Sequence, residues 1–293
     1  MSKPVSAPEH TLAQDPVFKA VSAKIHHNSF ANLDPTPDYP VKRIWAIGAI
    51  HGDIDQLKKL HGKLASRIQP GDCVIYLGNY FGYGNNAIRV FQELLNFRIW
   101  FLSGAPYQAA HDIVFLRGCQ EEMLAKMLLL ERAPDPASIL DWVEQQGMHQ
   151  LLEGFGLSWS LLRIAAHVGG QALPDWTKAA RVHLYSMPGF QDFIGGLKRA
   201  AYSHHAKLAL VHSGFDPALP LKAQNDQLWW EWKKFERYET SQENYRLIVR
   251  GYDPLNRGLS RGLFRLCVDG GAGRGGELYA TLISNKGIAL QWL

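Results

Sequence analysis

A histidine that directly follows an apolar run is a residue of this chain that could do chemistry. Residues 44–50 read Ile-Trp-Ala-Ile-Gly-Ala-Ile, and His51-Gly52 follows directly. The run predicts a buried strand, and apolar residues at helical spacing in residues 54–68 predict a helix after it. Ligands bind at the carboxyl ends of strands in open α/β sheets, and imidazole can ligate metals or transfer protons near neutral pH. His51 is therefore a candidate site residue.

The elements that must position this residue follow from the hydrophobic pattern. Strand-like and helical patterns alternate early in the chain, and strand-like patterns alone follow. This order predicts an α/β fold in which two sheets pack face to face with helices outside. The expected strands cover residues 73–77, 113–116, 208–212, 247–250, 264–268, 278–283 and 288–292, and the expected helices cover residues 54–68, 86–97, 120–132, 139–153, 176–185 and 190–205.

Composition and charge favour a globular protein of the cytoplasm. The 293 residues are 46% hydrophobic, which suffices for a substantial core, and no apolar run reaches the ~18 residues that span a bilayer. The net charge of +4 is spread along the chain, so we expect a solvated surface and no nucleic-acid partner. Three scattered cysteines fit a reducing compartment. Basic residues gather only loosely, in a C-terminal group that consists of Arg250, Arg257, Arg261, Arg265 and Arg274.

The chain divides into a tail and one domain. Residues 1–40 contain six prolines and little periodicity, so they are predicted to be an extended or disordered tail. The folded domain is expected to cover residues 41–293.

Glycine-rich strand ends recur along the domain. Residues 48–52 read Gly-Ala-Ile-His-Gly, residues 78–84 read Gly-Asn-Tyr-Phe-Gly-Tyr-Gly, and residues 117–121 read Arg-Gly-Cys-Gln-Glu. They resemble the Gly-Asp-x-His-Gly, Gly-Asp-Tyr-Val-Asp-Arg-Gly and Arg-Gly-Asn-His-Glu motifs of the calcineurin-like metallophosphoesterases, and specifically of the PPP-type serine/threonine protein phosphatases.

The same resemblance continues in order to the C-terminus. Residues 210–214 resemble Val-His-Ala-Gly, residues 226–232 resemble Leu-Leu-Trp-Ile-Arg, residues 249–254 resemble Val-x-Gly-His-Thr-Pro, and residues 267–273 resemble Ile-Asp-Thr-Gly-Ala. The resemblance implies a single-domain member of bacterial type with a four-layer α/β/β/α sandwich.

The departures from these motifs fall on the chemistry. Of the six metal-ligand positions, two keep their histidines and four have changed, and the general acid and both phosphate-binding arginines have changed as well. The ligand positions are now Ala49, His51, Asn79, Cys119, His212 and Tyr252; Gln120 replaces the histidine that protonates the leaving group, Gly82 replaces the second aspartate, and Tyr83 and Trp232 replace the arginines. An amide cannot transfer a proton near neutral pH.

These departures predict a pseudophosphatase. We expect no bound metal, because two divalent ions about 4 Å apart repel by roughly 16 kcal/mol at an effective dielectric of ~20 and the mapped ligands lack carboxylates. Such a protein would act by binding a partner protein, as a regulator or scaffold. An aromatic lining at Phe81, Tyr83, Trp232 and Tyr252 would either bind a peptide or planar ligand or simply fill the former cleft.

One enzymatic alternative remains open at this point. His51, Cys119 and His212 could converge on a single zinc ion, because two imidazoles and a thiolate with an open fourth position form a catalytic ligand set. The chain would then be a metal-dependent phosphoesterase or protein phosphatase with an altered site.

The segment of residues 99–111 resembles an insertion relative to the family. It is aromatic rather than polar, and long loops in compact domains are usually functional or disordered. Trp100, Phe101 and Tyr107 are therefore candidates for a partner surface, and the alternative is that the segment extends the helix and packs on the domain.

Overall fold

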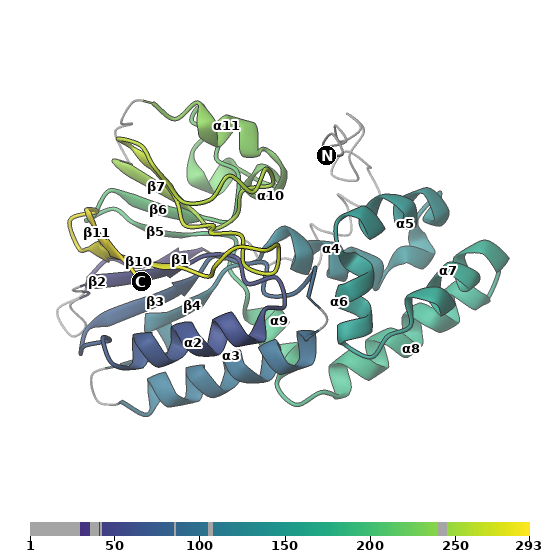
Figure 1. Ribbon diagram of the computed structural model, residues 1–293. Helices are drawn as coiled ribbons and strands as arrows, with labels where there is room; N and C mark the ends of the chain where they lie inside the picture. The colour runs from purple at the N-terminus through teal and green to yellow at the C-terminus, as the bar shows by residue number, and fades with distance from the viewer. Residues whose placement is uncertain (1–29, 36–40, 42, 85, 105–107, 240–244) are drawn as a thin grey trace.

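Two β-sheets form the centre of the molecule (Figure 1). The computed structural model describes residues 30–35, 41, 43–84, 86–104, 108–239 and 245–293. Within these residues, one sheet has five strands in the order β11 (Ala289–Trp292), β10 (Ala280–Ser284), β2 (Arg43–Ile47), β3 (Asp72–Tyr76) and β4 (Ile113–Phe115). The other has six, in the order β1 (Ala31–Asn32), β5 (Ala201–Ser203), β6 (Leu208–Val211), β7 (Leu247–Arg250), β9 (Arg265–Cys267) and β8 (Ser260–Arg261).

Parallel pairing brings the carboxyl ends of several strands to one edge of each sheet. Strands β2, β3 and β4 are parallel neighbours in one sheet, and β6, β7 and β9 are parallel neighbours in the other. Strand β10 runs antiparallel to β2 and extends the first sheet. The carboxyl ends of the parallel strands in each sheet therefore lie at one edge of that sheet, where α/β folds bind their ligands.

Side-chain alternation separates two cores. Along β2, Trp45 and Ile47 belong to the apolar cluster that includes the helices, whereas Ile44 and Ala46 belong to the cluster between the sheets. Successive residues of a strand point to opposite faces, so β2 buries both of its faces. Leu210 and Val249 of the six-stranded sheet complete the inter-sheet cluster.

Helices cover both outer faces. Helices α2 (Ile54–Ala65) and α3 (Ala87–Leu102) pack on the five-stranded sheet, and the short helices α10 (Gln227–Trp230) and α11 (Trp232–Glu236) lie beside the six-stranded sheet (Figure 1). Asp53 begins α2 because its carboxylate accepts a hydrogen bond from the Gln56 N–H at 3.1 Å. The predicted α/β/β/α sandwich is confirmed.

The helices that come between β4 and β5 in the sequence form a group that extends to one side of the sandwich (Figure 1). The predicted helix over residues 139–153 is two helices, because Gly147 takes a left-handed φ of 82° between them. The predicted helix over residues 190–205 ends at Gly196 and β5 follows, and the helix at residues 159–168 was not predicted. The helices are α4 (Cys119–Met127), α5 (Pro136–Gln145), α6 (Met148–Gly154), α7 (Trp159–Val168), α8 (Ala172–Ser186) and α9 (Phe190–Gly196).

Part of the predicted tail belongs to the folded domain. Ala31 pairs with Ala201 in the six-stranded sheet, Leu33 is only 3% exposed, and the Asp34 carboxylate accepts a hydrogen bond from the Ser203 hydroxyl at 2.8 Å. The domain therefore includes residues 30–35, and the boundary at residue 41 was placed too late. The rest of the predicted tail, residues 1–29 and 36–40, lies outside the described residues.

The predicted insertion begins as the last turn of α3. Helix α3 runs to Leu102, so the segment extends the helix. Phe101 is 1% exposed and belongs to the core, which removes it from the candidate partner surface, whereas Trp100 is 42% exposed. Tyr107 lies outside the described residues. Across the part of the chain that the structure describes, the helices are too short or too polar to cross a membrane.

Candidate functional site

The six predicted ligand positions lie at adjoining strand ends. Ala49 and His51 follow β2, Asn79 follows β3, and Cys119 follows β4. His212 follows β6 and Tyr252 follows β7 in the other sheet. Contacts across the two sheets join them: the Ala49 N–H donates to the Gly251 carbonyl at 2.9 Å, and the His212 ring lies beside that of Tyr252.

Asn79 is the polar centre of the first sheet's contribution. Its side-chain amide nitrogen lies 3.5 Å from Nε2 of His51, and its Oδ1 accepts from the Cys119 thiol at 3.3 Å and from the Gln120 N–H at 3.0 Å. An aspartate in this position could accept these bonds from Cys119 and Gln120, but it could not donate to His51. The Asn79 amide can therefore hydrogen-bond to His51 as well as to Cys119 and Gln120, whereas a carboxylate at this position would leave His51 free to bind a metal.

Aromatic rings occupy the middle of the site. The ring of Tyr252 stacks on His212 with centroids 5.3 Å apart and an interplanar angle of 12°, and it meets His51 edge-on at 5.3 Å. The ring of Tyr83 also meets that of His51 edge-on, with centroids 5.0 Å apart. Apolar contact continues through Ala49, Cys119 and Tyr252, which form one buried cluster with Trp229. Of the predicted aromatic lining, Tyr83 and Tyr252 thus pack against the same histidine.

The site is buried and carries little charge. Each of the six positions is at most 5% exposed. Burial lowers the pKa of His212 to about 4 and lowers that of His51 well below its usual value, so both rings are neutral at pH 7. Burial also raises the pKa of the Cys119 thiol to about 12, which keeps it protonated. A neutral thiol is neither a nucleophile nor a good metal ligand.

The turns that carry these residues have unusual backbone conformations. His51 and Asn79 have φ values of 50° and 56°, and Tyr83 has a φ of 29°. Non-glycine residues in this region are uncommon and cost roughly 1–3 kcal/mol each, so the surrounding contacts must hold them. Glu121 supplies such contacts, because its buried carboxylate accepts from the backbone N–H groups of Asn79 and Tyr80 at 2.9 Å each.

The side chain of Gln120 fills the space that a side chain at position 82 would need. Gly82 has a φ of 101°, and a Cβ there would lie 2.7 Å from Cδ of Gln120. An aspartate at position 82 would therefore require the Gln120 side chain to move. That side chain is 1% exposed and donates from Nε2 to the Gln146 carbonyl at 2.6 Å.

The connection between α5 and α6 covers this side of the site. Besides the bond to Gln146, the next residue, Gly147, is so close to Tyr83 that a Cβ on Gly147 would lie 2.9 Å from the Tyr83 backbone nitrogen. A backbone turn therefore lies against the two side chains that replace the family's general acid and one of its arginines.

Arg274 is a cation beside the site that the sequence placed only in the C-terminal basic group. Its guanidinium lies 4.9 Å from the centroid of the Tyr252 ring, and Nη2 pairs with Oδ2 of Asp269 at 2.5 Å. Arg250, from the same C-terminal group, is 1% exposed and pairs with Glu236 at 2.9 Å. The expectation of a solvated face is wrong for Arg250, which is buried beside acidic partners, and Arg274 is half-buried.

Trp232 does not reach the site. It lies outside the cluster of Ala49, Cys119 and Tyr252 and is only partly buried, with the guanidinium of Arg257 5.8 Å from its ring. Trp229, three residues earlier, belongs to that cluster, and its Nε1 donates to the Arg117 carbonyl at 2.8 Å. The guanidinium of Arg199 lies 4.6 Å from the centroid of the same ring. Neither tryptophan replaces the charge of an arginine.

The residues present do not fit a metal centre. Among the described residues, no three His, Cys, Asp or Glu side chains are grouped so that they could hold a metal ion. His212 uses Nδ1 to contact the Leu77 carbonyl at 2.8 Å, its Nε2 has no hydrogen-bond partner among the described residues, and the Tyr252 ring stacks on its face. His51, Cys119 and His212 thus lie at neighbouring strand ends without forming a ligand set.

Comparison with known proteins identifies the fold. No protein-family model and no curated protein matches the chain. The solved structure of a "putative diadenosine tetraphosphatase" is similar over 91% of this chain and 98% of its own, with 15% identity and a TM-score of 0.51. A protein serine/threonine phosphatase from Saccharomyces cerevisiae matches 92% of this chain and 81% of its own at 11% identity and a TM-score of 0.49. A metallophosphoesterase from Sphaerobacter thermophilus matches 86% and 88% at 12% identity and 0.43. At such identities the similarity shows the fold alone, which this chain shares with the first of these structures.

Proposed function

We propose that this protein is a pseudophosphatase: it keeps the metallophosphoesterase fold, lacks phosphatase catalysis and acts by binding a partner protein. The observation that carries the proposal is the burial and mutual packing of the six former ligand positions, none of them more than 5% exposed. Phosphoester hydrolysis on this fold needs metal ions, a proton donor and cationic phosphate contacts in an open cleft.

Metal binding is disfavoured by the charge of the site. Ala49 and Asn79 supply no anion, and the Cys119 thiol stays protonated because burial raises its pKa. The nearby carboxylates are already engaged: Asp269 pairs with Arg274, and Glu121 accepts backbone N–H groups. Two divalent ions need anionic ligands to offset their repulsion, and these residues provide none.

Proton transfer and phosphate binding are disfavoured by the side chains at the cleft. Gln120 has no titratable group, and its amide is committed to the Gln146 carbonyl. Tyr83 presents a ring where the resemblance would place one guanidinium group, Trp232 stands at the position of the other, and burial raises the pKa of Tyr83. A phosphate group would find neither its usual electrostatic partners nor an acid for the leaving group.

The catalytic half of the proposal is tested with p-nitrophenyl phosphate and phosphopeptides in the presence of manganese, iron or zinc. We expect turnover no higher than that of a matched preparation of the Gln120→Ala, His212→Ala variant. Losing a general acid alone costs ~10²–10⁴ in rate, and the phosphate clamp is lost in addition. Metal-dependent turnover that disappears in the variant would show that the site is active and would overturn the proposal.

A further inference from the structure

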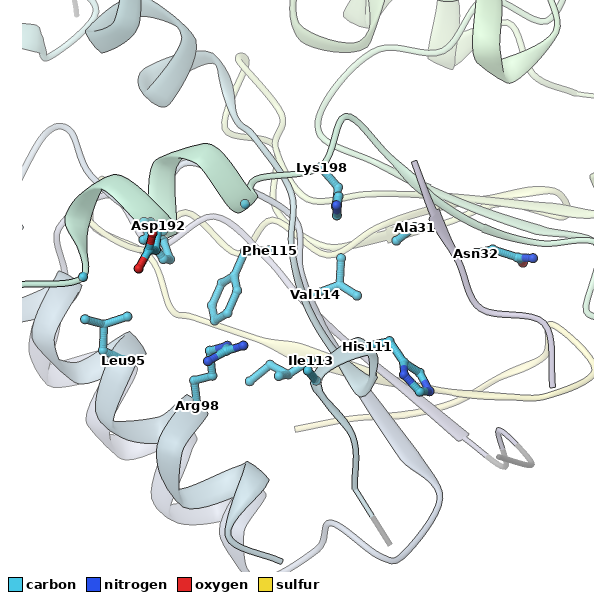
Figure 2. A pocket seen from close by; sticks show the side chains of 14 residues that line it. Ala31, Asn32, Leu95, Arg98, His111, Ile113, Val114, Phe115, Asp192 and Lys198 are labelled. Atoms are coloured by element: carbon cyan, nitrogen blue, oxygen red, sulfur yellow. The ribbon is translucent and has the colours of Figure 1, made fainter. Parts of the chain in front are cut away.

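A cavity of about 520 Å³ lies apart from the former metal site. It opens at the outer edge of β4, between α3, α9 and β1 (Figure 2). None of the six former ligand positions lines it. Its size is within the ~300–1,000 Å³ typical of small-molecule sites.

The cavity has an apolar and aromatic wall. Phe115 of β4 and Phe193 of α9 pack edge to face with centroids 5.2 Å apart, and Leu95 of α3 and Val114 also line the space. Both phenylalanines are less than 10% exposed, so the wall is fixed by the core behind it. Such a surface suits a ring or a hydrocarbon chain.

Two cations enter the cavity from different elements. Arg98 projects from α3 and Lys198 from the segment after α9, with Phe115 and Val114 between them in the view of Figure 2. Within the described residues, no carboxylate pairs with either side chain. Asp192 and His111 also line the cavity, so the described lining has two lysine or arginine cations against one carboxylate.

Backbone hydrogen bonds of Lys198 cover one end of the β4 edge and so limit the cavity there. The Lys198 N–H donates to the Phe115 carbonyl at 2.9 Å and the Lys198 carbonyl accepts from the Arg117 N–H at 2.7 Å, so this segment covers the edge of β4 at its carboxyl end. Ile113 lies two residues before Phe115, and alternate residues of a strand direct their backbone groups to the same side. Its N–H and carbonyl therefore face the uncovered edge, where a ligand could find further hydrogen bonds.

We propose that this cavity binds a small organic anion: a carboxylate or phosphoryl group carried on an apolar ring or chain. The anionic group would lie between Arg98 and Lys198, for which the described residues supply no carboxylate partner, and the apolar body would pack on Phe115 and Phe193. This site is separate from the former metal site, so the proposal stands whether or not the protein hydrolyses phosphoesters.

Calorimetric titration with three naphthalene compounds tests the proposal. The probes are 2-naphthoate, 2-naphthylphosphonate and the neutral 2-naphthamide, which share the ring and differ in the head group. We expect the anions to bind at least about tenfold more tightly than the amide, because charge-assisted hydrogen bonds contribute more than neutral ones. The first two probes also distinguish a carboxylate site from a phosphoryl site.

Two pairs of variants locate the binding. Arg98→Glu should weaken the anions at least about tenfold, and Arg89→Glu, on an exposed part of the same helix, should leave them unchanged. Gly196→Phe should fill the cavity, since a Cβ there meets no atom within 4 Å, whereas Gly195→Phe has the same freedom but does not line the cavity.

The outcomes are decisive in either direction. Tighter binding of one or both anions, lost in Arg98→Glu and Gly196→Phe but kept in their controls, would support the site. Absence of binding by all three probes, equal binding of the amide, or equal losses in the paired variants would overturn it. Circular dichroism of each variant confirms that it is folded before titration.

Discussion

The replaced residues at the strand ends form a mutually adjusted set. Asn79 both donates toward His51 and accepts from Cys119, which an aspartate could not do. Gly82 leaves the space that Gln120 now occupies, and Ala49 leaves space for a cluster with Trp229. Because each replacement accommodates another, reversing one alone would create a clash or an unpaired group. We therefore expect that single reversions do not restore a phosphatase.

Acid sensitivity should follow from the buried histidines. The pKa of His212 is about 4 in the folded protein against an ordinary 6.5, so between these values the unfolded chain binds the proton and the folded protein does not. Stability from this group is therefore present above pH 6.5 and is lost as the pH falls toward 4, by roughly 3 kcal/mol at pH 4.

The measurement is urea unfolding at a series of pH values from 7 to 4. His212→Asn keeps an amide that can donate to the Leu77 carbonyl but removes the titrating ring, so its free energy of unfolding should fall less steeply over this range. Identical slopes for the variant and the parent would show that His212 does not titrate in this way.

The sequence anticipated where the site residues lie better than how they pack. Motif order placed His51, Asn79, Cys119, His212 and Tyr252 at strand ends, and the sheets bring those ends together. Trp232 was expected beside them, but it lies outside their apolar cluster; three tryptophans occur between residues 229 and 232, so a motif with one tryptophan fits more than one register. Arg274 was grouped only with the other C-terminal basic residues, because its contact with Asp269 becomes visible only in the fold.

At the scale of the elements, long periodic segments were predicted well and irregular ones were not. Helix α2 and strands β2, β3 and β7 match their hydrophobic patterns closely. The two-residue strand β1 has no periodicity to detect and exists because it pairs with β5. Beyond Gly196 the apolar pattern continues, but the chain is drawn into a sheet by pairing with β6, which local propensity cannot foresee.

Neighbouring aromatic residues at the end of α3 should respond oppositely to truncation. Phe101 is 1% exposed and Trp100 is 42% exposed, although both lie in the last turn. Phe101→Ala should lower the free energy of unfolding by ~3–5 kcal/mol, as buried aromatic residues do, whereas Trp100→Ser should change it little. Chemical denaturation of both variants checks the difference.

The Trp100→Ser variant also tests the proposed partner surface. If the exposed ring of Trp100 contributes to it, Trp100→Ser should abolish co-purification of the partner without unfolding the protein. A large loss of stability in Trp100→Ser would instead assign this residue to the core and remove it from the proposed surface.

At the scale of the whole molecule, the hydrophobic core and the candidate site are separate. The inter-sheet cluster and the helix-covered cluster contain aliphatic residues of β2, β3, β4, β6, β7 and β9, whereas Ala49, Cys119 and Tyr252 belong to a small apolar cluster with Trp229. Substitutions in the small cluster should therefore remove little of the hydrophobic stabilisation of the domain. Under the proposed function, this separation of core from site would let the fold persist while residues of the site change.

Metal ions should accordingly leave the stability of the whole molecule unchanged. An ion that binds only the folded protein stabilises it by about 1.4 kcal/mol at tenfold excess over its Kd, which raises Tm by roughly 2–4 °C for a domain of this size. We expect no such shift on addition of millimolar manganese, and no stoichiometric iron or manganese by elemental analysis. A shift together with stoichiometric manganese would mean that the ligands have been assigned to the wrong residues.

Zinc requires its own control, because thiolate and imidazole ligands favour it over harder ions. Binding at His51, Cys119 and His212 would have to remove the proton from a buried thiol whose pKa is about 12, so zinc affinity should be weak at pH 7. We expect purified protein to contain no stoichiometric zinc and Cys119→Ala to have the same zinc content as the parent. Stoichiometric zinc that is lost in the Cys119→Ala, His212→Ala variant would instead establish a single-metal site, and it would require the strand ends to rearrange, since the three side chains are not grouped as ligands in the described structure.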